Sequence, residues 1–206
     1  MATITVYGAP QSTFTRAVCM GCVEKGVDYT LELTRPGGAG GINPFAKIPV
    51  IRHGAITLYE TPAILRYLDR SFGGPKLWPD DAYGAALVDQ WIGVVGDSVR
   101  SSAQLYMAAR YGLAPAPAEM VQRYLDKTRL VIPGFDRQLA STRFLAGDTF
   151  SAADVLFAPF YLYLADIPEL KAIADQAPNC QRWGREIAAR PSVAATEPPM
   201  KLPLAN

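Results

Sequence analysis

Two features near the N-terminus, in the stretch VYGAPQSTFTRAVCMGCVEKG (residues 6–26), have residue types that could do chemistry. Cys19 and Cys22 form a C-x-x-C motif, which near an N-terminal strand is typical of thioredoxin-like thiol–disulfide exchange. Ser12 stands seven residues before Cys19, after a Gly-Ala-Pro turn, and its hydroxyl could donate a hydrogen bond to a ligand. The two features predict different chemistries, and their positions on the first helix distinguish between them.

That helix should begin near Ser12 and end at Gly26, because a turn precedes the first and glycine stops a helix. A reactive C-x-x-C thiol lies at a helix N-terminus, where free N–H groups and the helix dipole stabilise its thiolate. Cys19 would lie about two turns inside the helix, where that effect has faded. One apolar stripe at helical spacing contains Phe14, Ala17, Val18, Gly21 and Cys22. We therefore interpret both cysteines as core residues rather than as a redox pair.

Ser12 by itself permits two interpretations. It could simply cap its helix, which is the common role of a serine at this position. It could also donate a hydrogen bond to a ligand above the turn, although it is a poor nucleophile without an adjacent base. The sequence has a single histidine, His53, in an Arg-His-Gly turn that we expect to be exposed to solvent. We therefore expect neither a Ser-His-Asp mechanism nor a metal site built on histidine.

The composition is that of a globular protein without a strong charge bias. Half of the 206 residues are hydrophobic, and 20 Lys and Arg against 19 Asp and Glu give a net charge of +1, so neither nucleic acid nor an anionic membrane is an expected partner. The longest apolar run, residues 155–165, contains Pro159 and is too short to span a bilayer. Three cysteines are too few for a disulfide scaffold, and the N-terminus does not resemble a signal peptide. We therefore expect a soluble, cytoplasmic protein.

The pattern of elements changes along the chain. Up to residue 72 it predicts strands and helices in the order βαβ-ββα, hence a small sheet backed by helices. GGPKLWPDD at residues 73–81 predicts a linker, and every long segment after it has a helical period. Residues 81–112 predict one long helix or a kinked pair, and residues 118–141 a helix with a kink at Pro133. The chain is thus predicted to have two domains, at residues 1–75 and 82–206.

The start of one later helix is defined by a capping box. Ser151 can cap the backbone at Asp154, and the Asp154 carboxylate can reach back to Ser151. Phe150 and Val155 occupy the two positions of a hydrophobic staple around the box. We interpret this segment as a folding signal rather than as a catalytic site.

Five segments, in order along nearly the whole chain, resemble one family. They are GAPQSTFTRAV (8–18), NPFAKIPVI (43–51), YETPAI (59–64), WPDDAYGAALVDQW (78–91) and LAGDTFSAADVLFAP (145–159). They resemble the cytosolic glutathione S-transferases, of the serine type, and are closest to the plant phi class and its bacterial relatives. The resemblance implies an α/β thioredoxin-like N-terminal domain that binds glutathione, and an all-α helical-bundle C-terminal domain that carries the hydrophobic-substrate pocket.

The resemblance also implies a reaction, in which the thiolate of glutathione attacks a small hydrophobic electrophile. Peroxidase and dehalogenase activities on the same scaffold use the same thiolate, and some family members are non-catalytic ligand carriers or assembly modules. Glutathione would be the co-substrate, no metal would be needed, and the protein would be a homodimer. Ser12 would be the hydroxyl that stabilises the thiolate. Tyr7 stands where tyrosine-type members carry their catalytic hydroxyl, and we assign it to packing or to the second-substrate pocket.

The same resemblance assigns the residues that would bind glutathione. Ile48, before a cis-proline at Pro49, would hold the cysteinyl unit through its backbone. Glu60 and Thr61 would take the γ-glutamyl end, the carboxylate receiving its ammonium and the helix start its carboxylate. Lys47 would help to bind the glycine carboxylate. Thr61 also fits a plain N-cap, with Pro62 at the first helical position.

Two further points concern the edges of the site. The segment TRPGGAGGI (34–42) is shorter and richer in glycine than the segment that forms the second helix of the family. The residues that would hold the glycine end of glutathione are therefore left open. Arg35 is one candidate. The acceptor pocket should lie between the first turn and the long helix. Its candidate residues are Phe14, Tyr106, Met107 and Tyr111.

Overall fold

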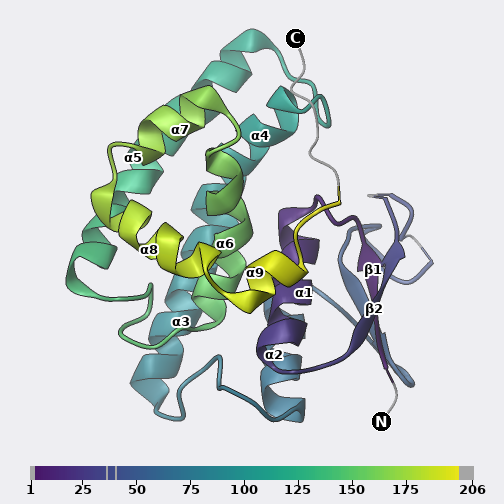
Figure 1. Ribbon diagram of the computed structural model, residues 1–206. Coiled ribbons are helices and arrows are strands. Elements are labelled where there is room, and N and C mark those ends of the chain that lie inside the picture. The colour runs from purple at the N-terminus through teal and green to yellow at the C-terminus, as the bar shows by residue number, and fades with distance from the viewer. Residues whose placement is uncertain (1–2, 36, 40, 200–206) are drawn as a thin grey trace.

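The computed structural model describes residues 3–35, 37–39 and 41–199, and its first part is a four-stranded sheet backed by two helices (Figure 1). The strands are β1 (Ile4–Gly8), β2 (Tyr29–Leu33), β3 (Val50–His53) and β4 (Ile56–Tyr59). Their order in the sheet is β2-β1-β3-β4, with β1 and β2 parallel and the other pairs antiparallel. Helix α1 (Thr13–Glu24) connects the two parallel strands, and α2 (Thr61–Ser71) follows β4. The predicted βαβ-ββα order is confirmed.

One face of this sheet and the two helices form a common core. Side chains alternate along β1, so Ile4 and Val6 are fully buried while Tyr7 on the other face is half-buried. Helix α1 lies close to α2 because Gly21 has no side chain: a Cβ there would lie 2.4 Å from the Cδ2 atom of Leu65. The close packing fixes the direction of α1 and hence the place where it begins.

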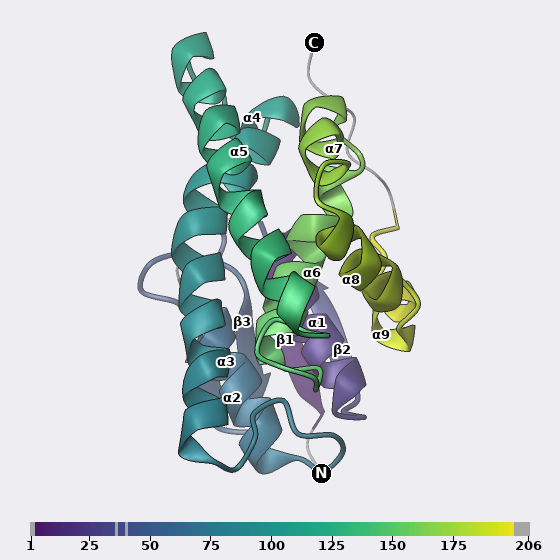
Figure 2. The same ribbon diagram turned by 90° about the vertical axis from the view of Figure 1, so that its left-hand side faces the viewer.

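The second part of the chain is helical. Its elements are α3 (Ala82–Val94), the π-helical segment η1 (Val95–Gln104), α4 (Leu105–Arg110), α5 (Ala118–Ser141), α6 (Ala152–Leu164), α7 (Pro168–Ala174), α8 (Pro178–Ala188) and α9 (Pro191–Ala195). Helix α6 lies at the centre and packs against α1 on one side and the long helices on the other (Figures 1 and 2). Residues 152–160 are all buried, as a central helix requires. Within the described ranges, no helix combines the length and apolar character needed to cross a membrane.

The helix predicted over residues 81–112 is one continuous rod with a change of helical type inside it. Helix α3 passes into η1 and η1 into α4 without an intervening loop. The α-helical part ends at Val94, one residue after Gly93, and Gly96 lies within the π-helical part. Such segments are frequent near functional sites. Pro133, predicted to kink the next helix, lies inside α5 and does not end it.

Helix α6 begins with the predicted capping box. The carboxylate of Asp154 accepts a hydrogen bond from the backbone N–H of Ser151 at 3.0 Å. The same buried carboxylate accepts from the N–H of Leu145 at 3.0 Å and from Nε1 of Trp183 on α8 at 2.9 Å. Asp154 therefore does more than cap its helix, because it joins α6 to the preceding loop and to α8.

The expectation that His53 is exposed to solvent is wrong. His53 ends β3 and is half-buried, with its Nδ1 atom 2.7 Å from the hydroxyl oxygen of Tyr67 on α2. Its ring also packs on Phe72, at 5.4 Å between ring centroids. The imidazole thus helps to join the β3–β4 hairpin to α2, which the turn sequence alone did not show.

Candidate active site

The register of the sheet brings three candidate segments to one end of it. Tyr7 on β1 pairs with Val50 on β3, and Val50 pairs with Tyr59 on β4. The turn after β1, the residue before β3 and the residue after β4 therefore leave the sheet side by side. Those segments contain Ser12, Pro49 and Glu60, which lie far apart in the sequence.

Ser12 is the N-cap of α1, and its local geometry leaves its proton available. Its hydroxyl oxygen accepts a hydrogen bond from the N–H of Thr15 at 3.3 Å, and its carbonyl accepts from the N–H of Arg16 at 2.8 Å. A hydroxyl that accepts from the backbone can still donate its own O–H. The side chain is half-buried, and no described group receives that proton. The two interpretations of Ser12, as a cap and as a donor, are therefore compatible.

The approach of β1 to α1 depends on glycine at position 8. A Cβ atom on Gly8 would lie 2.4 Å from the Oγ1 atom of Thr15, which is fully buried in the first turn of α1. The absence of a side chain lets the helix start directly above the strand end. This placement positions Ser12 over the end of the sheet.

The peptide bond between Ile48 and Pro49 is cis, at the position where the resemblance implied a cis-proline. The loop before it is held by Asn43, which is buried: its Nδ2 atom donates to the carbonyl oxygen of Lys47 at 2.8 Å, and its Oδ1 atom accepts from the N–H of Phe45 at 2.9 Å. Ile48 is half-buried and the Lys47 side chain is exposed. The backbone next to Pro49 is thus fixed, whereas Lys47 is free to reach a ligand.

Glu60 has an unusual backbone conformation. Its φ of 69° lies in the left-handed region, which is rare for a residue with a side chain and tends to occur at functional sites. Glu60 is the N-cap of α2, and Thr61, which is buried, is the first residue of the helix. The interpretation of Thr61 as the N-cap is therefore wrong, because Glu60 occupies that position. The Glu60 carboxylate is exposed beside the free N–H groups at the start of α2. A group that can bind a cation therefore lies next to a group that can bind an anion.

A pocket of about 500 Å³ opens beside Ser12. Its wall includes two of the candidate residues for the acceptor pocket, Met107 and Tyr111, at the end of the long rod. Burial raises the pKa of Tyr111 to about 12, so its hydroxyl stays neutral near pH 7. Phe14 and Tyr106 do not line this pocket: Phe14 packs edge-on against Phe160 at 5.3 Å, and Tyr106 is buried.

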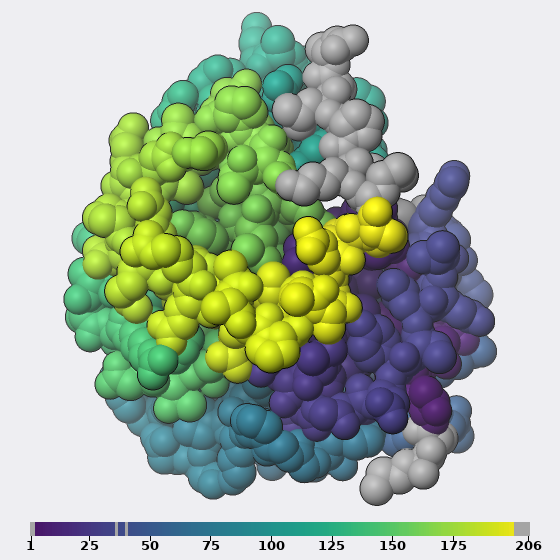
Figure 3. All heavy atoms as spheres, in the orientation of Figure 1, coloured from purple at the N-terminus to yellow at the C-terminus, as the bar shows by residue number. Residues whose placement is uncertain are grey.

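Other residues line the pocket that the sequence did not point to. They are Gln11, Thr13, Arg16, Gln104, Leu162, Tyr163, Asp166, Val193 and Glu197, among others. Thr13 and Arg16 could have been found, because they follow Ser12 at the start of the same helix and Arg16 is one turn further on. Val193 and Glu197 could not, because their position depends on how the end of the chain folds back. Figure 3 shows the segment up to residue 199, in yellow, lying against the N-terminal residues in purple.

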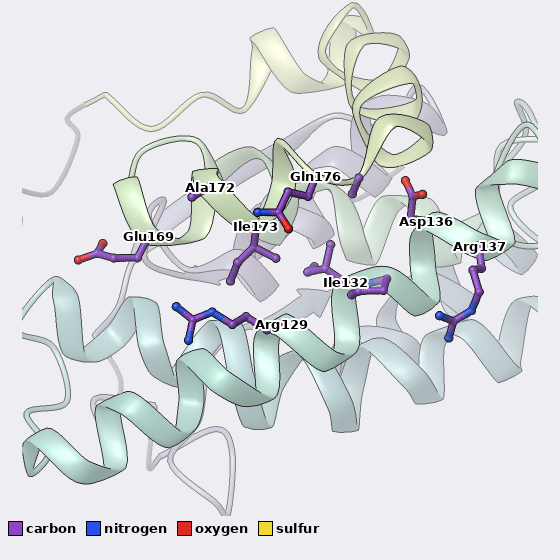
Figure 4. A pocket seen from close by; sticks show the side chains of 10 residues that line it. Arg129, Ile132, Asp136, Arg137, Glu169, Ala172, Ile173 and Gln176 are labelled. Atoms are coloured by element: carbon purple, nitrogen blue, oxygen red, sulfur yellow. The ribbon is translucent and has the colours of Figure 1, made fainter.

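A second pocket, of about 410 Å³, lies between α5 and α7, and Ser12 is not among its lining residues (Figure 4). Asp136 on its wall accepts hydrogen bonds from the N–H groups of Asn179 and Cys180, at 2.8 and 2.9 Å. Glu169, also on the wall, lies 3.6 Å from Arg110. Both carboxylates thus have partners on other helices, which gives them a role in joining those helices.

Comparison with known proteins agrees with this arrangement. The glutathione S-transferase N-terminal domain model matches residues 6–76 and the C-terminal domain model residues 100–191. Glutathione S-transferase 4 of Zea mays is 30% identical over 202 residues, which cover 92% of this chain and 89% of the maize protein. The chain belongs to the glutathione S-transferase family.

Solved structures of the glutathione S-transferase family show the same fold. Glutathione S-transferase III in its apo form has a TM-score of 0.87 and 28% identity, covering 98% of this chain and 100% of the other. Glutathione S-transferase I from maize, in complex with an atrazine glutathione conjugate, has a TM-score of 0.85 and 26% identity, covering 97% and 100%. The resemblance inferred from the sequence, and the fold it implied, are confirmed.

Tyr7, the alternative hydroxyl for a glutathione S-transferase, lies on the sheet face away from the helices. The guanidinium carbon of Arg52 lies over its ring, 5.6 Å from the centroid. Tyr7 is not among the residues that line the pocket beside Ser12. Its geometry fits the packing role better than the pocket role.

The C-x-x-C motif of this glutathione S-transferase lies in the core. Cys19 is 3% exposed and Cys22 is fully buried. Burial raises the pKa of Cys19 to about 11, and burial together with the neighbouring Cys19 raises the pKa of Cys22. Both thiols are therefore protonated near pH 7, which confirms the interpretation of the pair as core residues.

The loop expected to differ from the family lacks a helix in its described part. The described residues 34–35, 37–39 and 41–49 form hydrogen-bonded turns, such as the one from the Gly38 N–H to the Arg35 carbonyl at 2.9 Å. Residues 36 and 40 lie outside the described part. Arg35 is exposed, and no described contact fixes its side chain toward the site.

Proposed function

We propose that this protein is a glutathione transferase that joins the thiolate of glutathione to small hydrophobic electrophiles. The observation that supports it most is the position of Ser12, whose donor hydroxyl lies at the N-terminus of α1 and on the wall of the 500 Å³ pocket. Pro49, Glu60 and Thr61 leave the same end of the sheet. The maize relative with an atrazine glutathione conjugate has the same fold, which adds support.

The chemical task is to supply thiolate near neutral pH. A free thiol with a pKa of about 8.5 is ionised to only a few per cent at pH 7. Lowering the pKa by about 2 units requires about 2.7 kcal/mol of preferential stabilisation of the thiolate. One hydroxyl donor supplies about half to all of this in a dry site, and the N-terminus of α1 adds to it. The thiolate then forms a carbon–sulfur bond, and the acceptor loses its leaving group or gains a proton.

The rest of glutathione would be held by the other segments. The fixed backbone at Ile48 would pair with the cysteinyl unit, and the exposed Lys47 would reach the glycine carboxylate. At the γ-glutamyl end, Glu60 would receive the ammonium, and the start of α2 at Thr61 would receive the carboxylate. Met107 and Tyr111 would form part of the acceptor side.

Replacing Glu60 with glutamine should weaken glutathione binding by about 1.5–3 kcal/mol, the range for a hydrogen bond to a charged group. The amide keeps the size of the side chain but cannot neutralise an ammonium. Calorimetric titration with glutathione measures the effect. Glu119 on α5 also has an exposed carboxylate, so Glu119→Gln is the matched control. This variant should bind glutathione as the unaltered protein does. Equal affinity in the two variants would remove Glu60 from the site.

Titration with glutathione while thiolate absorbance is followed tests the proposed function directly. A transferase should bind glutathione and show thiolate absorbance at pH values below the thiol pKa of free glutathione. A non-catalytic carrier or assembly module would show no such absorbance. A thiol oxidoreductase would instead show protein thiolate without glutathione, which the buried cysteines argue against.

We also propose a homodimer, because the resemblance implies a two-fold interface between the first domain of one subunit and the helical domain of the other. Large apolar side chains are exposed in both parts, such as Phe45 at 65% and Tyr83 at 75%. Light scattering at micromolar concentration should give twice the 22.3 kDa of one chain. A monomer mass under those conditions would contradict the proposal.

A cytoplasmic location fits the state of the cysteines. Cys19, Cys22 and Cys180 are all free and buried, with no disulfide among them. Free thiols are typical of a reducing compartment. Fractionation of cells that produce the protein would test the location.

A further inference from the structure

The pocket beside Ser12 contains a buried arginine that the proposed chemistry does not use. Arg16 lies one turn after Ser12 on α1, lines the pocket and is only 5% exposed. Arginine is always charged in proteins, and burying a charge is costly unless a partner compensates it. The partners of this guanidinium therefore indicate what the site is built to hold.

The described contacts of Arg16 compensate its charge only in part. Its Nη2 atom donates to the carbonyl oxygen of Val193 on α9, at 3.2 Å. The guanidinium carbon lies 5.8 Å from the centroid of the Tyr163 ring. The Nε–H has no hydrogen-bond partner among the described residues, and none of their carboxylates forms an ion pair with Arg16.

Arg16 is held in this position by the elements around it. Helix α9, which provides the Val193 carbonyl, is bound to α1 by Glu24: the Glu24 carboxylate accepts from Nη2 of Arg190 at 2.7 Å and from the hydroxyl of Ser192 at 2.5 Å. The guanidinium is thus confined between α1, α6 and α9. A confined donor can bind a ligand without first losing freedom.

A second buried donor lines the same pocket. Thr13, the first residue of α1, is 6% exposed, and its hydroxyl has no hydrogen-bond partner among the described residues. Unpaired buried polar groups are rare because each loses its hydrogen bonds to water without gaining a partner in the protein. The Tyr163 hydroxyl is a third buried group of this pocket without a hydrogen-bond partner among the described residues. Such groups next to the proposed thiolate site point to a ligand that pairs with them.

Two carboxylates also line the pocket, Asp166 and Glu197. Glu197 is exposed and Asp166 is half-buried, so water screens their charges. Arg16 is buried, where the effective dielectric constant is lower and its field is stronger. Arg16 is thus the least screened of the three charges in the inner part of the pocket, although the charge of Asp166 also reaches Tyr111 and Tyr163 there.

We propose that Arg16 and Thr13 form an anion subsite for the acceptor, so that this protein prefers electrophiles carrying a carboxylate or another oxyanion close to the reacting carbon. The inference rests on the proposed transferase function and names the class of acceptor. A carboxylate can accept from the free Nε–H of Arg16 and from the hydroxyl of Thr13. The apolar wall at Met107 and Tyr111 would hold the rest of the acceptor.

A matched pair of acceptors tests this preference. The pair is 4-chloro-3,5-dinitrobenzoate and 4-chloro-3,5-dinitrobenzamide. In both, the glutathione thiolate forms a bond to the carbon that carries chlorine, and chloride leaves with the electron pair of the broken bond. Each kcat/KM is divided by the rate constant of the uncatalysed reaction, which removes the difference in intrinsic reactivity. We expect the corrected ratio to favour the benzoate by about tenfold or more, as for a charge-assisted hydrogen bond.

Variants assign the preference to the subsite. Arg16→Met, which keeps the length of the side chain, should lower the benzoate-to-benzamide ratio by about ten- to a hundredfold. Thr13→Val, which keeps the shape, should lower it severalfold. Arg123→Met, an exposed arginine on α5 away from the pocket, should leave the ratio unchanged. If Arg16→Met does not fold, as judged by circular dichroism, the benzoate-to-benzamide ratio of Thr13→Val is the test. A severalfold lower ratio supports the subsite, and an unchanged ratio contradicts it.

Several results would overturn the inference. One is a corrected ratio near one in the unaltered protein, and another is a preference for the benzoate that survives Arg16→Met. A third is weaker glutathione binding in Arg16→Met with an unchanged ratio, because Arg16 would then serve glutathione.

A binding measurement separates this inference from the proposed function. If the protein neither binds glutathione nor turns over either acceptor, the transferase proposal fails by itself. Unreactive 3,5-dinitrobenzoate and 3,5-dinitrobenzamide are then compared by calorimetry. Tighter binding of the benzoate that Arg16→Met abolishes supports the anion subsite, and equal binding of the two compounds refutes it.

Discussion

Replacing Ser12 with alanine is expected to lower turnover by about ten- to a thousandfold, the effect of losing one preorganised donor. The hydroxyl of Ser12 accepts a bond from the Thr15 N–H and has its own proton free for the thiolate. Without that donor, the pKa of bound glutathione should rise. The pH profile of kcat/KM and the thiolate absorbance of the glutathione complex measure the two effects independently.

Alanine at position 12 also removes a helix cap, which costs about 1 kcal/mol of stability. Thermal unfolding of Ser12→Ala therefore accompanies the kinetics, so that a loss of folded protein is not mistaken for a loss of chemistry. A shifted pH profile is the result that a purely structural role of Ser12 would not give.

Three further single variants are the controls for this prediction. Cys19→Ser and Cys22→Ser should keep nearly full turnover, because both thiols lie in the core and are protonated. Cys22→Ser should lose stability, since it places a hydroxyl in an apolar site. Tyr7→Phe should have a modest effect. Loss of activity in Tyr7→Phe with retention in Ser12→Ala would establish the tyrosine mechanism, and loss in Cys19→Ser would establish the redox motif.

The elements of this fold could be predicted because their signals are local. The turn before Ser12, the alternation in β1 and the capping box at Ser151 each depend on residues within one or two turns of one another. The interpretation of Cys22 also followed from a local pattern, the helical stripe on which it lies. Such signals do not depend on how distant parts of the chain meet.

The walls of the pocket were harder to predict because they depend on distant contacts. Phe14 and Tyr106 are aromatic residues at helical spacing, and such residues pack in a core as readily as they line a pocket. Arg16 was overlooked because a charged residue on a helix is usually exposed. It is buried here because α9 folds back over α1, a contact between residues 177 positions apart.

Replacing Asp154 with alanine is expected to lower the free energy of unfolding by about 3–5 kcal/mol, without changing any group proposed to contact glutathione. The carboxylate accepts hydrogen bonds from the N–H groups of Leu145 and Ser151 and from Nε1 of Trp183, all within 3.0 Å. Alanine would leave these buried donors unpaired, at about 1–3 kcal/mol each, and the helix would lose its cap. The total is smaller than the sum because the loop before α6 can relax.

Urea denaturation followed by tryptophan fluorescence measures this loss, because Trp183 itself is one of the partners of Asp154. Asp154→Asn should lose less stability than Asp154→Ala, because its amide oxygen can still accept hydrogen bonds. It should still be less stable than the unaltered protein, because its NH₂ group cannot accept from the remaining donors. Asp28→Ala, an exposed carboxylate before β2, is the control and should change stability by no more than about 0.5 kcal/mol. If Asp154→Ala matched this control, the carboxylate would not be what joins α6 to α8. The pocket wall at Tyr163, which α6 carries, would then owe its position to apolar packing alone.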